Sequence, residues 1–421
     1  MFVRTLLAVS LSCMFAGSVF AAATAEQPLN PQMIATPASS ALAPQPITTL
    51  ASQSALQQPA STAVASLQQP ASTAVAAVQQ DVTQANQTLD NLQKTEDQTA
   101  AIGETTTPTS PTKASSSNAA AASWTLDGIN NAQWYDNIGK GQFPIYARAH
   151  VMLNNAHASP GAIDGSSGQN TLKAISAFQQ MNGLKPTGVL TKETWDALLA
   201  RQGNKPAFIE HTLTANDVKG PFAKSIPSDY ALQAKMPGLY YTRVSEALAE
   251  KFHMDEEFLK KLNPKSSFKA GDKILVTNIR NELPEDIHLI VAVKSARQLY
   301  LFNSRNQMVG AFPASIGGTN TPSPSGTHTI TGVARNPHYS YSPSNFVQGN
   351  NLKPLSLPPG PNGPVGNIWI SLSKRSFGIH GTPNPSMISK SFSHGCIRLT
   401  NWDANDLGRK VKNGTTVIFK E

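Results

Sequence analysis

The sequence predicts a multidomain chain in which a mainly β C-terminal domain follows a small three-helix domain, a small α+β module and a disordered N-terminal linker. Three observations predict this order. Residues 27–80 carry no charged side chain, apolar residues recur at helical spacing between about 124 and 262, and short β-rich runs fill 286–421. A chain of 421 residues is long enough for two or three such domains.

Residues 1–21 have the pattern of a signal peptide. Arg4 precedes an apolar stretch, Leu6–Phe20, and small residues follow from Ala21. No later stretch is apolar for long enough to span a bilayer, so we expect an exported chain without an integral membrane segment. Cys13 lies inside the signal, and the lipoprotein reading of it is the weaker one because Met14–Ala23 is still apolar.

Residues 22–123 are expected to be a flexible low-complexity linker. LQQPASTAVA occurs at 56–65 and again at 67–76, within a segment of Ala, Gln, Ser, Thr and Pro. Such a composition buries too little apolar surface to offset its ordering entropy. An eleven-residue repeat can also wind a right-handed helical supercoil, but Pro59 and Pro70 interrupt it.

Charge is concentrated in the part that is expected to fold. The net charge is +1 for residues 1–25, −4 for 26–123 and +11 for 124–421, which gives +8 for the chain. A basic folded region attracts polyanions, and outside a bacterial inner membrane these are cell-wall polymers, lipopolysaccharide and anionic lipid. Nucleic acid is not expected, because no basic run with interleaved aromatic residues is present. Simple colloidal solubility is an equal alternative.

Residues 124–204 are expected to form the three-helix domain. Asn170-Thr171 is expected to cap one helix, which ends at Gly183, and Thr191 to begin another with Glu193 in its first turn. The inward positions at helical spacing are Leu172, Ile175, Phe178, Met181, Trp195, Leu198 and Leu199.

This region resembles the small peptidoglycan-binding domain through the runs IDG, AFQQMNGL and TGVLTKETWDAL. One position departs from that family, because Ser167 precedes Gly168 where an aromatic residue is usual. The resemblance implies binding of peptidoglycan sugar or peptide, and a spacer that merely folds is the alternative.

Residues 205–285 are expected to form the α+β module. The stretch from Leu239 reads strand, helix, helix, strand: LYYT opens it, Val244, Leu248 and Phe252 recur at helical spacing, and KILV closes it after the turn at Gly271-Asp272. LKKLNP and FKAGDKILV resemble a LysM module in a degenerate form, because RVSE replaces the usual glycine-aspartate-threonine start. Glycan binding by this module stays open.

Residues 286–421 read as mostly strand. The β-rich runs are IHLIVAV, QLYLFN, MVGAFPASIG, TPSPSGTHTITGV, VGNIWISL and GTTVIF, with turn chemistry at Lys294-Ser295 and Asn303-Ser304. Between them, residues 336–364 are rich in Pro, Asn and Gly and have no clear period. A loop of this length inside a compact domain is more often a binding lid than filler, so we expect it to cover a site.

The candidate site is the run Ser393-His394-Gly395-Cys396, with a second histidine at His380. After signal removal Cys396 is the single thiol, which in an oxidising compartment is accidental, paired with another chain or kept because it reacts. A thiol attacks a carbonyl carbon as the thiolate, so it needs a neighbouring base, and both histidines are candidates. Gly395 permits an unusual backbone angle and close approach of substrate, and neighbouring backbone N–H groups are placed to face a developing oxyanion.

At these residues the chain resembles the L,D-transpeptidase catalytic domain, also called YkuD-like. The family motif is a histidine, a variable stretch and Ser/Thr-His-Gly-Cys, which here is His380, residues 381–392 and Ser393–Cys396. IVAVKSARQLYLFN, TPSPSGTHTI and NGTTVIF extend the resemblance over about 286–421. It implies a β-sandwich-like fold.

The resemblance also implies roles for individual residues. Cys396 is the nucleophile and His380 its general base and acid, oriented by the carbonyl of Gly381. Ser393, His394 and Gly395 have supporting roles. Arg398 suits a substrate carboxylate, with an ion pair to Asp403 or Asp406 as the structural alternative.

The implied chemistry is acyl transfer through a cysteine thioester, without a cofactor. The enzyme would cleave the L-to-D peptide bond of a peptidoglycan tetrapeptide stem and pass the acyl group to an amine, cross-linking the cell wall in the periplasm. Water as acceptor gives an L,D-carboxypeptidase, and an envelope lipoprotein is a further acceptor. Two other classes remain open: a zinc site of His380, His394 and Cys396, which lacks a fourth ligand, and a non-catalytic wall-binding scaffold.

Overall fold

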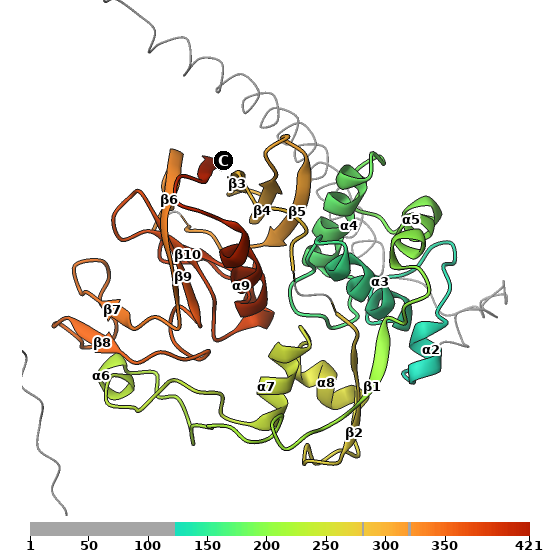
Figure 1. The fold of residues 1–421 in the computed structure, drawn as a ribbon, viewed down its shortest axis with the longest axis horizontal. Coiled ribbons are helices and arrows are strands. Elements are labelled where there is room, and N and C mark those ends of the chain that lie inside the picture. The colour runs from blue at the N-terminus through green and yellow to red at the C-terminus, as the bar shows by residue number, and fades with distance from the viewer. Residues whose placement is uncertain (1–122, 280–281, 319–320) are drawn as a thin grey trace, which may run out of the picture. The chain divides into compact units, whose positions relative to one another are not determined.

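The computed structural model describes residues 123–279, 282–318 and 321–421 (Figure 1). The predicted signal peptide at 1–21 and residues 22–122 of the predicted linker lie outside the described residues. No helix in these three ranges is long and apolar enough to cross a membrane.

Helices form the first folded region. They are α2 (Leu126–Asn130), α3 (Pro144–Asn155), α4 (Gln169–Met181) and α5 (Lys192–Gln202). Thr191 caps α5 through its side chain as expected, and Gly183 follows α4 with a positive φ of 68°. The predicted cap of α4 is wrong: Gly168 is the N-cap, and Thr171 lies inside the helix, where its hydroxyl donates to the Ser166 carbonyl at 2.6 Å.

The middle module contains β1 (Phe208–Thr212), α6 (Tyr230–Gln233), α7 (Val244–Lys251), α8 (Glu256–Leu262) and β2 (Lys273–Thr277). The order strand, helix, helix, strand is present, but its first strand is β1, which pairs antiparallel with β2 from Phe208 opposite Thr277. LYYT at 239–242, which was expected to be that strand, has no strand structure. Leu239 instead exchanges backbone hydrogen bonds with Pro359 and Asn362 of the 336–364 loop, both at 2.9 Å.

The C-terminal region is built on an eight-stranded mixed sheet in the order β11-β10-β9-β6-β12-β3-β4-β5. Its strands are β3 (Leu289–Val293), β4 (Gln298–Phe302), β5 (Met308–Pro313), β6 (Gly326–Arg335), β9 (Ile368–Leu372), β10 (Gly378–His380), β11 (Ile397–Arg398) and β12 (Thr416–Lys420). All six runs that were predicted as strands contain one. The first half of β6 pairs with β12 and its second half with β9, across a register shift after Ile330, so this strand carries the chain from one half of the sheet to the other.

The strands β3 and β4 are buried on both faces, which explains their unbroken apolar sequences. Because side chains alternate along a strand, Ile290, Ala292, Leu299 and Leu301 face an inner core shared with β9, β10, β11 and the C-terminal helix. Their neighbours face the helical region and share a core with α3, α4 and α5: Leu289, Val291, Val293, Tyr300 and Phe302. The helical domain therefore forms a layer on the eight-stranded sheet.

This region also contains a hairpin, two short strands and a helix that the sequence did not predict. The 336–364 loop contains a small hairpin of β7 (Tyr339–Tyr341) and β8 (Leu355–Leu357). The strands β10 and β11 have only three and two residues. Helix α9 (Asn401–Lys410) follows them and begins at Thr400, whose hydroxyl accepts from the Asp403 N–H at 3.1 Å.

Candidate active site

His380, Cys396 and Arg398 meet because two short strands run side by side. Strands β10 and β11 are parallel, with His380 opposite Arg398. Cys396 lies in the bend of residues 394–396 directly before β11, so its position follows from that turn and not from strand alternation. All three line one cavity of about 850 Å³, together with Ser393 and His394.

The turn that presents the thiol is tied at several points. The Ser393 hydroxyl donates to the Cys396 carbonyl and accepts from the Gly395 N–H at 3.2 Å. Gly395 has a φ of 103°, which favours glycine, and its carbonyl accepts from Ser323 at 2.6 Å. Residues 394–396 form a bend before β11, so the alternation of side chains along a strand does not place His394 and Cys396 on one face. The Gly395 N–H donates to Ser393, so it is not one of the free backbone donors that we expect to face an oxyanion.

The His380 ring is fixed as one tautomer. Its Nδ1 lies 2.7 Å from the Gly381 carbonyl, which can only accept, so Nδ1 carries the proton and Nε2 keeps its lone pair. The indole of Trp369 stacks on the ring with centroids 5.5 Å apart. Burial lowers the pKa of His380 to about 4, against the smaller opposing effect of the Gly381 hydrogen bond. The ring is therefore neutral at pH 7.

The Cys396 thiol is half-buried, and its sulfur lies 3.7 Å from the Ser376 carbonyl. Burial raises the pKa of the thiol, and hydrogen bonding from the Gly378 backbone and the charge of Arg398 offset this only in part. At neutral pH the free site therefore holds a neutral thiol and a neutral imidazole that line the same cavity. Such a pair supports general-base chemistry, in which the proton leaves sulfur as the sulfur attacks.

His394 and Arg398 are placed differently from the two central residues. The ring of His394 stacks on Phe346 of the 336–364 loop, with centroids 4.5 Å apart and planes 10° apart. Arg398 donates to the Phe392 carbonyl and lines the cavity. The ion pair considered for Arg398 does not form, since Asp403 accepts from Ser159 at 2.8 Å and Asp406 accepts from the Leu283 N–H at 2.9 Å.

Aromatic residues that the sequence reading missed form another wall of the cavity. Tyr339 and Phe346 come from the 336–364 loop, which therefore lines the cavity, and Tyr230 comes from α6 of the middle module. The Tyr230 ring meets Tyr339, Tyr341 and Phe346 edge to face, at 6.0, 5.4 and 6.4 Å between centroids. The density of aromatic residues in YSYSPSNF was a usable signal for the loop. Nothing local to Tyr230 pointed to the site.

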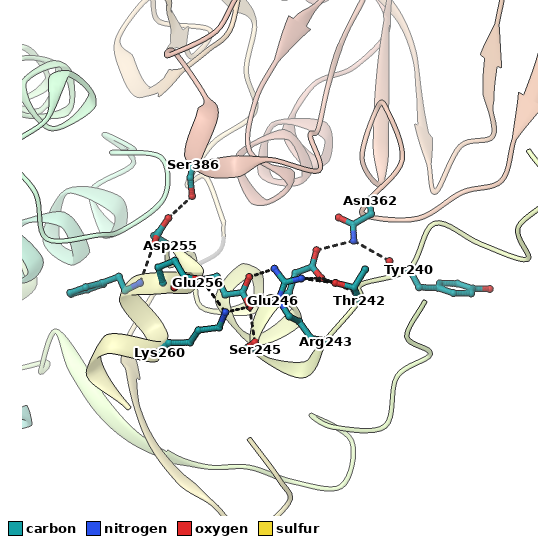
Figure 2. Close-up of polar contacts among 12 residues, drawn as sticks. Tyr240, Thr242, Arg243, Ser245, Glu246, Asp255, Glu256, Lys260, Asn362 and Ser386 are labelled. Atoms are coloured by element: carbon teal, nitrogen blue, oxygen red, sulfur yellow. Dashed lines mark hydrogen bonds and ion pairs between the residues drawn. The ribbon is translucent and has the colours of Figure 1, made fainter. Parts of the chain in front are cut away.

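The middle module is joined to the catalytic region by polar contacts (Figure 2). Asn362 donates to Glu246 of α7 at 2.8 Å and to the Tyr240 carbonyl at 3.0 Å. Ser386 donates to Asp255, the N-cap of α8. The module thus contacts both segments that flank the cavity at 358–366 and 382–387.

A metal centre finds no support in the described ranges. No group of three or more His, Cys, Asp or Glu side chains in them is arranged to hold an ion. His380, His394 and Cys396 border the same cavity, but the ring of His394 is engaged with Phe346. The zinc reading of these three residues is therefore set aside.

Comparison with known proteins identifies both domains. Residues 287–419 match the L,D-transpeptidase catalytic domain family, YkuD, and 149–198 match the family described as "Putative peptidoglycan binding domain". Two relatives are each named "Putative L,D-transpeptidase YkuD". The protein from Bacillus licheniformis is 34% identical over 41% of this chain and 90% of its own length. The protein from Bacillus subtilis is 31% identical over 41% of this chain and 91% of its own length.

Solved structures of L,D-transpeptidases are also similar in part. One from Xylanimonas cellulosilytica covers 68% of this chain and 98% of that chain, with 16% identity and a TM-score of 0.30. L,D-transpeptidase 3 from Mycobacterium tuberculosis covers 32% of this chain and 61% of that chain, with 22% identity and a TM-score of 0.28. The LysM-like reading of 205–285 stays a prediction. On the identity and coverage of its Bacillus relatives, the chain belongs to the L,D-transpeptidase family.

Proposed function

We propose that this protein is an exported cysteine acyltransferase that cross-links peptidoglycan. It cleaves the L-to-D peptide bond after the third residue of a tetrapeptide stem and transfers the acyl group to the amine of a second stem. The observation that carries the proposal is that His380 and Cys396 line one cavity, with Nε2 of His380 left as a base. The signal pattern at 1–21 supports export to the periplasm.

The first step forms a thioester. As the Cys396 sulfur attacks the carbonyl carbon, Nε2 of His380 takes the thiol proton. The carbon–nitrogen bond then breaks, and His380 returns the proton to the departing D-alanine amine. A fixed imidazole suits both transfers, because the Gly381 carbonyl and the Trp369 ring restrict its rotation.

The second step releases the enzyme. The acceptor amine attacks the thioester carbon, His380 takes a proton from this amine, and the carbon–sulfur bond breaks to return the proton to sulfur. The aromatic wall of Tyr230, Tyr339 and Phe346 would favour an amine over water by excluding solvent from the thioester. Arg398 would bind a carboxylate of the stem peptide.

The peptidoglycan-binding domain and the middle module would keep the polymer close to the cavity. Holding the substrate raises its effective concentration at the site without any new contact at the reacting atoms. A hydrolytic role as L,D-carboxypeptidase and attachment of an envelope lipoprotein use the same thioester, so the acceptor distinguishes them. A scaffold without activity would need no proton-accepting histidine beside its cysteine.

The test uses the purified mature protein with disaccharide-tetrapeptide fragments of peptidoglycan and separates the products by mass. We expect a dimer that lacks one D-alanine, and no dimer with Cys396→Ala. Tripeptide without dimer would instead indicate water as acceptor or a missing acceptor such as the lipoprotein. Dimer formation by Cys396→Ala at the wild-type rate would refute the proposal, and no product from either protein would favour the scaffold.

A further inference from the structure

A buried carboxyl from the middle module lies behind the candidate base. Glu250, in the last turn of α7, is buried, and Nδ2 of Asn401 lies 2.9 Å from its Oε1 and 3.0 Å from its Oε2. The hydroxyl of Tyr241 donates to Oε2 at 3.1 Å. Asn401 is the first residue of α9 in the catalytic domain, so these bonds cross between the two regions.

The Asn401 side chain contacts both Glu250 and the segment 381–382, which orients His380. Its Oδ1 accepts from the Thr382 N–H at 3.1 Å. The same oxygen is packed so closely against Gly381 and Gly366 that a Cβ at either glycine would lie 2.0 Å from it. Gly381 in turn supplies the carbonyl to which Nδ1 of His380 donates at 2.7 Å. A rotation of the Asn401 amide would therefore release the support of residues 381–382.

The Asn401 amide has two ends that must not be exchanged. With Nδ2 toward the Glu250 carboxyl, Oδ1 faces the Thr382 N–H, and the opposite orientation would set two donors against each other. Asn401 also donates to the Pro361 carbonyl at 3.3 Å, which favours the same orientation. Glu250 therefore favours the working orientation together with the Thr382 N–H and the Pro361 carbonyl.

No cation neutralises this carboxyl among its described contacts, which are Asn401 and Tyr241, with Glu246 nearby on the same helix. Burial raises the pKa of Glu250 to about 8, so the group is mostly protonated at neutral pH. Burying a carboxyl costs free energy that an apolar side chain would avoid. A carboxyl at this buried position is explained if the site needs the hydrogen bonds that Glu250 makes.

We propose that Glu250 is a positioning residue for the transpeptidase reaction, acting through Asn401 and the Gly381-Thr382 backbone on His380. The middle module would then complete the active site in addition to any binding of glycan. This inference rests on the proposed function, because it assigns Glu250 a role only if His380 is the base. At metal sites, the groups that orient the ligating side chains are worth about 10–100-fold in activity, and we expect an effect of the same order here.

The test compares three variants of the mature full chain. Glu250→Leu removes the hydrogen bonds that the carboxyl accepts from Asn401 and Tyr241, whereas Glu250→Gln keeps a carbonyl oxygen for Asn401. Ser386→Ala is the matched control, because it removes another hydrogen bond between the module and the catalytic domain without touching the Asn401 chain (Figure 2). We expect Glu250→Leu to lower kcat about 10–100-fold with KM within about threefold. Glu250→Gln and Ser386→Ala should stay within about threefold of wild type.

If Glu250→Leu does not fold, Asn401→Ala interrupts the same chain from the other side and should lower kcat similarly. Equal kcat in Glu250→Leu and Ser386→Ala, or an unchanged kcat in Asn401→Ala, would overturn the proposal. The rate of iodoacetamide alkylation of Cys396 at pH 7 is measured in parallel. The His380→Gln variant gives the rate that remains without the base. Alkylation slowed by Glu250→Leu but not by Glu250→Gln would support the positioning role even if no peptidoglycan product forms, which separates this inference from the proposed function.

Discussion

The indole of Trp369 lies nearly parallel to the imidazole of His380, with ring planes 18° apart and centroids 5.5 Å apart. Trp369 also donates from Nε1 to the Ser371 hydroxyl at 2.9 Å, which fixes the plane of the indole. One face of the candidate base is therefore shielded from water. This shielding contributes to the burial that lowers the pKa of His380 to about 4.

Trp369→Ala should move the acid limb of the pH profile upward. The fall of kcat/KM at low pH reports protonation of His380 in the free enzyme. The wild-type protein should therefore lose activity only as the pH falls through about 4. Admitting water to the ring favours the charged imidazolium, so the limb of the variant should shift toward the ordinary histidine value of about 6.5. Trp369→Phe keeps an aromatic face and is the control. A limb that stays in place in Trp369→Ala would show that the indole does not set this pKa.

The raised pKa of Cys396 predicts slow alkylation of the free enzyme at neutral pH. Because burial raises the pKa of this thiol above its ordinary value, only a small fraction of it is thiolate at pH 7. The alkylation rate with iodoacetamide should therefore keep rising beyond pH 9, measured by mass spectrometry of the intact protein. A rate that is already constant between pH 5 and 8 would reveal a preformed thiolate-imidazolium pair, contrary to the neutral site described above.

Tyr230→Ala should weaken substrate binding more than Tyr230→Phe. The Tyr230 ring meets Tyr339, Tyr341 and Phe346, which ties the middle module to the loop that lines the cavity. Aromatic pairs are worth about 0.5–1.5 kcal/mol each beyond their buried area, so loss of all three should raise KM at least about tenfold. Tyr230→Phe keeps these contacts and should stay within about threefold. Equal KM in both variants would locate the effect in the hydroxyl group.

Phe178→Ala should destabilise the catalytic region although it lies in the peptidoglycan-binding domain. Phe178 is fully buried in the core that α4 shares with β3 and β4. Truncating a buried phenylalanine costs about 3–5 kcal/mol of unfolding free energy. Calorimetry should show one transition for both regions, shifted downward with the temperature of inactivation. Activity that survives above the melting of the helices would contradict the shared core.

The central strands could be predicted from the sequence, and so could the placement of His380 and Cys396 at one cavity. Their signals are local: IHLIVAV and QLYLFN are mostly apolar because both faces of β3 and β4 are covered, and the Ser-His-Gly-Cys turn is continuous in the chain. The strands β10 and β11 were not predicted, because three and two residues are too few to show an alternation of apolar and polar side chains.

The errors arise where a residue's partner is distant in sequence. LYYT is apolar because Leu239 packs with Tyr341 and Leu357, and this is the same pattern that a strand would show. The strand that does pair with β2 is Phe208–Thr212, more than sixty residues earlier, and it contains both polar and apolar side chains. Tyr230 and Glu250 reach the site through tertiary packing that no local pattern encodes.

The central claim is that Cys396 carries the acyl group during turnover. Its most direct test is rapid quenching of the mature protein with a tetrapeptide stem, followed by mass spectrometry of the intact protein and of its Cys396 peptide. We predict an added mass equal to the stem without its terminal D-alanine, located on Cys396, released by hydroxylamine and absent from Cys396→Ala. Product formation with no adduct on Cys396 at any quench time, or an adduct on another residue, would contradict the account.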